Sequence, residues 1–266
     1  MNIQPIKTRK LLPPQDDLLS VIRETIKEIP ERSILAITSK VVSIWKGRTM
    51  KTSEIDKDEL IKKSARKFLD RSEVPERHVM HTITNNVLIG SAGIDESNSN
   101  GYYTLWPEKP KLVAKEIYDW LRKEYGVSQF GVIISDSRSI PMRRGAIGFA
   151  LAFWGFNPLL DYVDKADLFN RLFKAEKANL ADGLAAAAVV AMGEGAEQTP
   201  MAIISDLSKI EFSDKEVSQK KSEDAWEINF ENDIFYPFLN RAPWQEGGGE
   251  IGDWFQNMNR AAVSDV

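Results

Sequence analysis

The apolar residues of the chain alternate between short continuous runs and longer segments with helical spacing. Residues 34–37, 131–134 and 201–204 are short apolar runs without proline or charge, which is typical of strands buried inside a sheet. Residues 111–125 carry apolar side chains at helical spacing, and residues 185–190 form an Ala-rich run, so both segments predict helices. The hydrophobic pattern therefore predicts a chain that contains both buried strands and helices.

Three further stretches add to the predicted elements. Asp16 or Asp17 is a suitable N-cap for an apolar-periodic helix that ends near residues 29–30. Residues 51–77 alternate charges with apolar side chains at helical spacing and predict an exposed amphipathic helix. Residues 145–155 are small and apolar with interleaved glycine, which indicates close-packed core, either as a strand pair or as an interface.

Composition and charge narrow the possible partners. The chain has 266 residues, enough for one large or two modest domains. Its net charge is −4 and its pI about 5.5, so a nucleic-acid partner is not expected. The sequence shows neither the apolar core of a signal peptide nor an apolar run long enough for a membrane helix. We therefore expect a cytoplasmic protein without a membrane partner.

The inventory of metal-binding side chains is short. The chain contains no cysteine, which excludes disulfides, thiolate zinc sites and a cysteine nucleophile. Its two histidines, His78 and His81, have no third soft ligand nearby in the sequence. Any bound metal is therefore expected to be held by oxygen atoms.

The most informative stretch is GVIISDSRSIPMRRG, residues 131–145. A buried strand is followed at once by Asp136 between two serines, and then by Arg138, Arg143 and Arg144. Carboxylate oxygens suit a hard cation such as magnesium or manganese, and each planar guanidinium matches a phosphate or a carboxylate. This arrangement is what a metal-and-phosphate site needs. The alternative is a polar surface loop in which the arginines pair with neighbouring acids.

Polar groups follow other apolar segments in the same way. Ser39 and Lys40 come directly after a predicted strand and could cradle a phosphate, or could be a solvated strand end. Asp95 and Asn98 follow a glycine-punctuated turn and could reach a cation and a ribose, or form an Asx-rich surface turn. Glu194 lies between two glycines after the Ala-rich helix, where it could offer a carboxylate to a cation or belong to a helix C-cap.

The order of these segments is more specific than any one of them. The succession TSKVVSIWKGR, SAGIDESN, ISDSRSIPMRRG, DYVDKADLFNR and NLADGLAAAAVVAMGEGAEQTP resembles the coenzyme F-420 γ-glutamyl ligase family. It is most similar to the bacterial branch described as folate-metabolism γ-glutamate ligases. The resemblance covers about residues 6–212.

The resemblance implies a fold and an activity. The fold would be α/β (mixed α+β) with two interleaved subdomains, forming a catalytic region at residues 1–212, with an acidic, aromatic-containing extension at 213–266. The family joins L-glutamate to a carboxylate of its acceptor through an acyl phosphate. It uses GTP, or ATP in some relatives, and two divalent cations, magnesium or manganese. Homodimerisation is expected from the relatives.

The resemblance also implies roles for individual residues. One cation would be held by Asp95 and Asp136, and the other by Ser137 and Glu194. We regard Arg138, Arg143 and Arg144 as candidates for binding the acceptor carboxylate or the developing charge. The nucleotide contacts would come from Arg9, Lys10, Leu11, Leu12, Ser39, Lys40, Asn98, Met192, Gly193, Gly195, Ala196, Glu197, Gln198 and Thr199.

The sequence departs from the family pattern at a few positions. The family often has a lysine where Ile44 follows Ser43, and Lys46 or Lys40 could compensate for it. Asn170 replaces a glycine that is usual before Arg171. The acceptor stays open between a folate-like pterin, which we favour, and the des-glutamyl form of coenzyme F-420. A non-catalytic protein that binds a nucleotide or a pterin on the same scaffold is the alternative function.

Overall fold

The computed structural model describes residues 1–214 and 226–249, which form two compact units. Unit 1 combines Met1–Arg48 with Lys109–Trp226, and unit 2 combines Thr49–Glu108 with the residues from Glu227 on. Each unit is assembled from two separate stretches of the chain, and the stretches of the two units alternate along the sequence. The expected mixed α/β fold with two interleaved subdomains is therefore confirmed.

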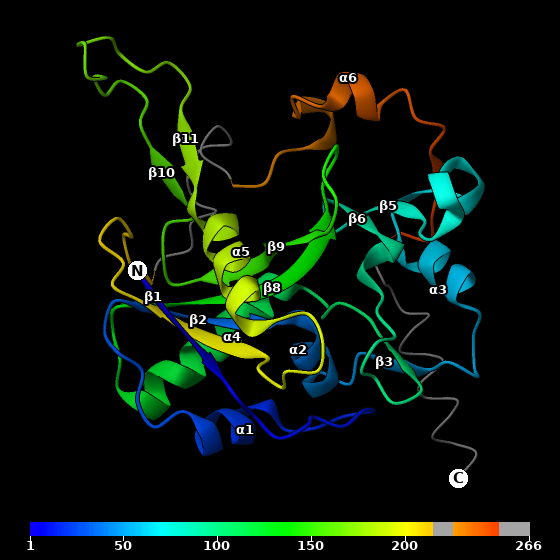
Figure 1. Ribbon diagram of the computed structural model, residues 1–266, viewed down its shortest axis with the longest axis horizontal. Helices are drawn as coiled ribbons and strands as arrows, with labels where there is room; N and C mark the ends of the chain where they lie inside the picture. Colours follow the sequence, from blue (N-terminus) through cyan, green and yellow to red (C-terminus); the bar gives the residue numbers. More distant parts are fainter. Residues whose placement is uncertain (215–225, 250–266) are drawn as a thin grey trace. The chain divides into compact units, whose positions relative to one another are not determined.

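A five-stranded sheet forms the centre of unit 1 (Figure 1). Strands β2 (Ser33–Thr38) and β8 (Phe130–Ser139) run parallel to each other, whereas all other neighbouring strands are antiparallel. The apolar residues of β2 and of the first half of β8 are fully buried, as expected of central strands. The remaining strands give the order β1-β12-β2-β8-β9, with β1 (Asn2–Ile6), β12 (Met201–Ser205) and β9 (Ala146–Trp154).

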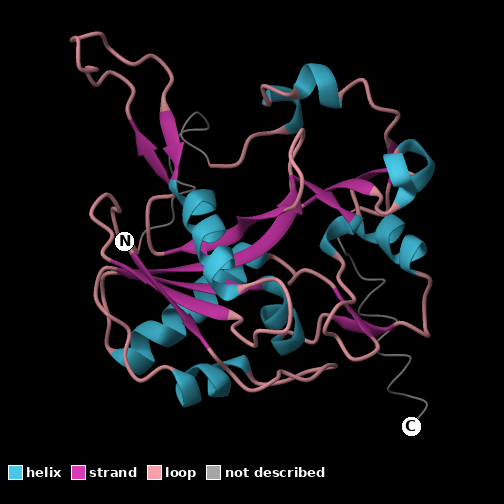
Figure 2. Cartoon of the chain, viewed as in Figure 1, coloured by secondary structure: helices cyan, strands magenta, loops and turns pink. Residues whose placement is uncertain are grey.

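Helix α5 (Leu180–Met192) covers one face of this sheet (Figure 2). Its alanines allow a close approach to the strands, and Gly148 of β9 lies directly against Ala185 and Val189 of the helix. A Cβ atom at Gly148 would lie 2.8 Å from the carbonyl oxygen of Ala185 and 2.7 Å from the side chain of Val189. The core on this face consists of Ala181, Leu184, Ala185, Ala188 and Met192 against Ile34, Ala36, Ile133, Ala150, Ala202 and Ile204.

The opposite face of the sheet packs against helix α4 (Pro110–Tyr125). The ring of Tyr118 stacks on Phe130 with centroids 4.4 Å apart. Ile133 packs against α5, and Phe130 is three residues before it on β8. Because side chains alternate between the two faces of a strand, Phe130 points away from α5. Helix α1 (Leu18–Thr25) lies beside α4, where Arg23 pairs with Glu124. Unit 1 therefore has helices on both faces of its sheet.

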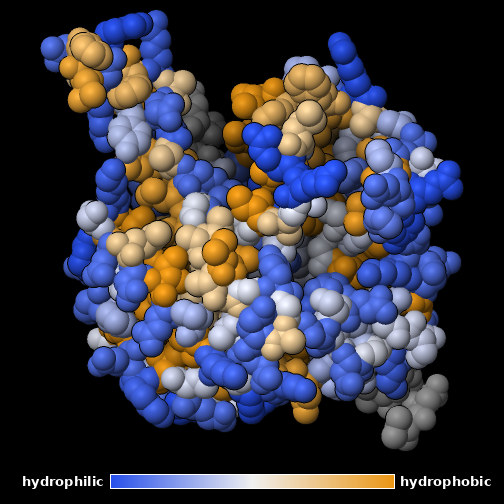
Figure 3. Space-filling model, in the orientation of Figure 1, coloured by the Kyte–Doolittle hydropathy of each residue, from blue (hydrophilic) through white to orange (hydrophobic). Residues whose placement is uncertain are grey.

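A two-stranded arm projects from unit 1 before helix α5. Strands β10 (Leu159–Asp161) and β11 (Lys177–Asn179) form its base, and residues 162–176 form its tip. Leu168 and Phe169 in this tip are 96% and 84% exposed, and Figure 3 shows hydrophobic side chains gathered there.

Unit 2 has its own antiparallel sheet and its own core. The strands are β4 (Lys67–Leu69), β5 (His81–Thr84), β6 (Val87–Gly90) and β13 (Gln245–Glu246), in the order β13-β4-β5-β6. Helix α3 (Lys57–Ser64) supplies Leu60 and Ile61 to the core. A separate ribbon pairs β3 (Thr49–Lys51) with β7 (Tyr102–Thr104), and α6 (Tyr236–Leu239) is a single short turn.

Several predicted elements differ from the structure. Residues 51–77 are not one helix, because α3 covers only Lys57–Ser64 and a strand and two helical turns follow it. Helix α1 ends at Thr25, well before residues 29–30. Residues that follow the predicted strand 34–37 form helix α2 (Ser39–Trp45), which the apolar pattern did not reveal. Asp136 to Ser139 belong to strand β8 and not to a loop.

The described part of the C-terminal segment contacts both units separately. Trp226 packs edge-on against Phe153 in unit 1, with ring centroids 5.1 Å apart. In unit 2, β13 pairs with β4. Phe235 and Phe238 are 57% and 75% exposed, so these two aromatic rings of the extension do not pack on the body of the protein. The boundary at residues 212 and 213 stays a prediction, and residues 215–225 and 250–266 lie outside the described ones. None of the helices described is both long and apolar enough to cross a membrane.

Replacing Gly148 by alanine is expected to lower the free energy of unfolding by about 1–3 kcal/mol, because the added methyl group overlaps the backbone of α5. Gly183→Ala is the control: it lies inside α5 with open space around its Cα, and should raise the stability by about 0.5–1 kcal/mol. Urea unfolding midpoints of both variants measure the difference. Wild-type stability in Gly148→Ala would contradict the packing described.

Candidate functional site

The parallel pairing of β2 and β8 brings two predicted site residues together. Thr38 at the end of β2 is in register with Ser135 of β8, so the next residues, Ser39 and Asp136, are neighbours. The hydroxyl of Ser39 donates a hydrogen bond to Oδ2 of Asp136 at 2.8 Å. The backbone N–H of Ser137 donates to Oδ1 at 2.7 Å. Both oxygens of this carboxylate are thus held in fixed directions.

Ser137 and Glu194 form a second pair on the other face of β8. Ser137 is in register with Gly148, whose open side faces α5, and directly opposite residues share a face of the sheet. Glu194 follows the C-terminus of α5, and its Oε2 lies 3.3 Å from the hydroxyl of Ser137. The close packing of α5 on β9 therefore determines where this carboxylate lies.

These donor atoms fit a hard divalent cation. All of them are carboxylate or hydroxyl oxygens, which magnesium and manganese prefer. Within either unit, the described residues include no group of three or more His, Cys, Asp or Glu side chains able to hold a metal ion. Magnesium commonly keeps water ligands and takes oxygens from a substrate phosphate, so one carboxylate with a hydroxyl is a sufficient protein contribution.

Asp95 and Asn98 belong to unit 2, whereas the other predicted metal ligands belong to unit 1. The backbone of Asp95 exchanges two hydrogen bonds with Thr104, at 3.0 and 2.8 Å. Its carboxylate accepts the N–H of Ser97 at 2.8 Å in a local turn, and Asn98 has a positive φ of 55°. That Asp95 shares a cation with Asp136 stays a prediction.

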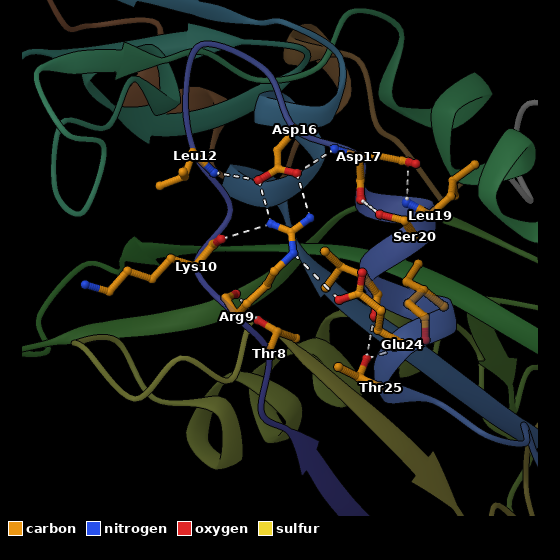
Figure 4. Close-up of polar contacts among 12 residues, drawn as sticks. Thr8, Arg9, Lys10, Leu12, Asp16, Asp17, Leu19, Ser20, Glu24 and Thr25 are labelled. Carbon is orange, nitrogen blue, oxygen red and sulfur yellow. Dashed lines mark hydrogen bonds and ion pairs between the residues drawn. The ribbon is translucent and has the colours of Figure 1, made fainter.

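The segment predicted to contact the nucleotide near the N-terminus is folded around Asp16 (Figure 4). Both carboxylate oxygens of Asp16 accept from the guanidinium of Arg9, at 2.7 and 2.8 Å. The N–H of Leu12 and the N–H of Asp17 also donate to this carboxylate. The bond from Arg9, with these backbone donors, lowers the pKa of Asp16 from 3.8 to about 2. Asp17, rather than Asp16, is the N-cap of α1.

The second predicted nucleotide segment, residues 192–199, is a hydrogen-bonded loop beside the first. The carboxylate of Glu197 accepts the N–H of Gly195 at 2.8 Å, and the hydroxyl of Thr199 donates to the carbonyl of Met192 at 2.5 Å. The carbonyl of Gln198 accepts the N–H of Thr8 at 2.9 Å, just before the segment 9–12. Two stretches that are distant in sequence are thus joined in unit 1.

The three predicted arginines lie on the β8–β9 hairpin but differ in their surroundings. Arg138 is on β8 itself, where its guanidinium stacks over the ring of Phe149 at 4.9 Å and lies 3.9 Å from Asp182. Arg143 donates to the carbonyl of Met142 within the exposed connection, and Arg144 is exposed. Only Arg138 has a defined position on the sheet.

The departure at Ile44 has a structural counterpart. Ile44 is 2% exposed and belongs to the buried side of α2. Lys46 cannot simply replace a missing phosphate ligand, because its ammonium is 2.6 Å from Glu116 of α4 and lies over the ring of Trp45. Because Glu116 neutralises Lys46, the net positive charge in this part of the site is smaller than the presence of Lys46 suggests.

Sequence reasoning missed the roles of Asp16, Asp182 and Phe149. The sequence indicates Asp16 as a possible helix cap, although its distance of seven residues from Arg9 is also compatible with a loop-closing pair. Asp182 lies in the first turn of α5. No local signal reveals its contact with β8, because that contact depends on how α5 lies across the sheet.

Comparisons with known proteins identify the family of this chain. The family model described as F420-0:Gamma-glutamyl ligase matches residues 6–206. Coenzyme F420:L-glutamate ligase of Methanopyrus kandleri is 32% identical over 222 residues, covering 78% of this chain and 87% of that protein. The proteins of the same name from Methanosarcina acetivorans and Methanothermobacter thermautotrophicus are 30% and 29% identical, and the matches span 85% and 80% of those proteins.

These matches define the protein as an enzyme of the ligase class. More specifically, the chain belongs to the F420-0:Gamma-glutamyl ligase family.

The Arg9–Asp16 pair should make stability depend on pH in the acidic range. Because the folded state lowers the pKa of Asp16, the pair stabilises the fold above about pH 3.8, and this contribution is lost as the pH falls through about 2. Urea unfolding of wild type and Asp16→Asn at pH values between 5 and 2 measures it. We expect the wild type to be more stable at pH 5 and the two curves to converge on acidification. Parallel curves would show that the pair contributes nothing.

Proposed function

We propose that the chain joins L-glutamate to the des-glutamyl form of coenzyme F420 in a reaction that consumes GTP or ATP. The names of the relatives, coenzyme F420:L-glutamate ligases, support this acceptor over the folate-like pterin. The observation that carries the proposal is the set of hard oxygen donors at adjacent positions of β8. Asp136 with Ser39 lies on one face, and Ser137 with Glu194 on the other.

The proposed reaction activates a carboxylate in two steps. An acceptor carboxylate oxygen attacks the terminal phosphorus of the nucleotide, and the nucleoside diphosphate leaves. The amine of glutamate then attacks the acyl carbon, loses a proton and displaces phosphate, which forms the amide bond. Divalent cations, magnesium or manganese, would neutralise charge on the phosphates during the transfer. No covalent enzyme intermediate is required.

The residues of the chain orient these groups in the proposed reaction. Ser39 and the N–H of Ser137 fix the Asp136 carboxylate, which with Asp95 would hold one cation. Ser137 and Glu194 would hold the other. The loop closed by Asp16 and the neighbouring loop 192–199 would contact the nucleotide, since backbone hydrogen bonds join these two loops.

Homodimerisation is part of the proposal. The predicted contribution of residues 145–155 does not fit, because most of this segment is buried in the core of unit 1. The exposed Leu168, Phe169 and Leu172 at the tip of the two-stranded arm are better suited to contact a second copy.

The Asp136→Asn variant should lose glutamate-dependent nucleotide hydrolysis, with a decrease of at least about a hundredfold, because the amide removes the negative charge that the cation requires. Phosphate release is measured with acceptor, glutamate, nucleotide and magnesium present. Asp119→Asn is the matched control, since Asp119 lies on the surface of α4 and pairs only with Lys115 among the described residues. Unchanged turnover in Asp136→Asn, with a wild-type melting temperature, would refute the assignment.

The acceptor can be identified by transfer of labelled glutamate. We expect label to enter des-glutamyl F420 in the presence of GTP and magnesium, and folate to remain unlabelled. The environment of Ile44 and Lys46 favours one other outcome, a protein that binds a nucleotide without turnover, because Ile44 is a buried apolar residue and Lys46 pairs with Glu116. Calorimetric binding of nucleotide without transfer to either acceptor would support this second function and contradict the first.

A further inference from the structure

We propose that Asp182 and Asn179 position Arg138 on the ring of Phe149, so that Arg138 binds a substrate carboxylate next to the cation site. The proposal rests on the proposed ligase function and adds a carboxylate subsite to it. It concerns four side chains, those of Arg138, Phe149, Asn179 and Asp182, to which neither the family description nor the names of the relatives assign a role.

Arg138 lies on the same face of the sheet as the proposed cation ligand. Asp136 and Arg138 are two residues apart on β8, and alternate residues of a strand share a face. Their Cα atoms are therefore about 7 Å apart at a rise of about 3.3 Å per residue. Phe149 is in register with Asp136, so its ring lies on this face as well. A group bound by Arg138 would thus be close to the cation at Asp136.

Asp182, in the first turn of α5, is held rigidly against the edge strand of the sheet. Its Oδ1 accepts the N–H of Ala150 on the edge strand β9 at 2.9 Å, and its Oδ2 accepts the side-chain amide of Asn179 at 2.9 Å. Asn179 is the N-cap of α5, where it accepts the N–H of Asp182 at 3.1 Å. The carboxylate is therefore fixed by the strand on one side and by the start of the helix on the other.

The guanidinium of Arg138 keeps its hydrogen-bond donors available. It is 3.9 Å from Oδ2 of Asp182, which is too long for a hydrogen bond, and among the described residues it donates to no acceptor. Two other arginines of the chain behave differently: Arg9 on Asp16 and Arg71 on Asp58 bind their carboxylates directly, at 2.7–2.9 Å. An arginine with a purely structural role would be expected to resemble these two.

The ring of Phe149 and the charge of Asp182 orient Arg138 without occupying its donors. Stacking on an aromatic face fixes the guanidinium plane through the ring quadrupole. The nearby carboxylate of Asp182 attracts the guanidinium of Arg138 and lowers the net positive charge around it. A planar fork with reduced net charge suits a singly charged carboxylate better than a multiply charged phosphate. Both the acceptor and glutamate carry such groups, and the experiment distinguishes them.

Calorimetric titration tests the proposal without depending on turnover. L-Glutamate, des-glutamyl F420 and GTP with magnesium are titrated separately into wild type, Arg138→Gln, Asp182→Asn and the double variant. We expect Arg138→Gln to weaken one of the two carboxylate ligands about tenfold or more, which is typical of a lost charge-assisted hydrogen bond. Asp182→Asn should weaken the same ligand about threefold, with GTP affinity unchanged.

The double variant and a conservative variant separate positioning from other roles. Because Asp182 acts through Arg138, the double variant should bind no more weakly than Arg138→Gln alone. Arg138→Lys keeps the charge but lacks the planar fork, so it should not restore binding. Asp161→Asn is the control, because Asp161 forms an exposed ion pair with Lys177 at the base of the arm.

Several results would overturn the proposal. The proposal would be overturned if the variants kept wild-type affinity for both carboxylate ligands, or if only their affinity for GTP decreased. It would also be overturned if the losses of affinity in the two single variants added up in the double variant, or if the affinity for all ligands decreased together with the melting temperature. Absence of carboxylate binding by the wild type would also overturn it. A different result would reject the ligase function alone: the wild type would bind the carboxylate ligand but would not transfer labelled glutamate.

Discussion

The parallel pairing of β2 with β8 is the constraint on which the site depends. The carboxyl ends of neighbouring parallel strands lie side by side, so the residues that follow the two strands are close together even when the chain between the strands is long. Here the chain between β2 and β8 includes helix α2, the first stretch of unit 2 and helix α4. A shift of one residue in this register would move Asp136 to the opposite face and away from Ser39.

The second determinant is the small size of the residues between α5 and the sheet. Alanines on the helix and Gly148 on the strand let the backbones approach, and this approach brings Glu194 at the end of α5 to Ser137. The start of the same helix brings Asp182 to Arg138. One closely packed helix thus contributes a carboxylate at each of its ends.

The sequence predicted those parts of the fold in which burial and periodicity coincide. The central strands, α4 and α5 are long or uniformly buried, and their patterns identified them. Asp136, Ser137 and Glu194 were predicted as cation ligands and Ser39 as a nucleotide contact, because they follow apolar strands or the Ala-rich helix. The family resemblance paired Ser137 with Glu194, and the structure shows these two side chains in contact. It paired Asp136 with Asp95, whereas the contact of Asp136 with Ser39 was not predicted.

The features that the sequence did not predict depend on tertiary contacts. Strand β8 continues through Ser139 because β9 pairs with it, although its side chains become polar after Ile134. Residues 51–77 have helical periodicity throughout, but pairing of β4 with β5 and β13 interrupts the helix after Ser64. Asp16 closes a loop because Arg9 folds back onto it, which no periodicity encodes.

The contact of Trp226 has a consequence for the limits of the catalytic region. This residue lies beyond the part of the chain that the family description covers, yet its indole N–H donates to Asn179 at 3.3 Å and its ring packs on Phe153. A truncated form ending at residue 212 would retain every residue of the family match and still lose this anchor at the base of α5. A fragment that keeps the contacts of Trp226 must therefore be longer than the stretch that the family model matches, residues 6–206.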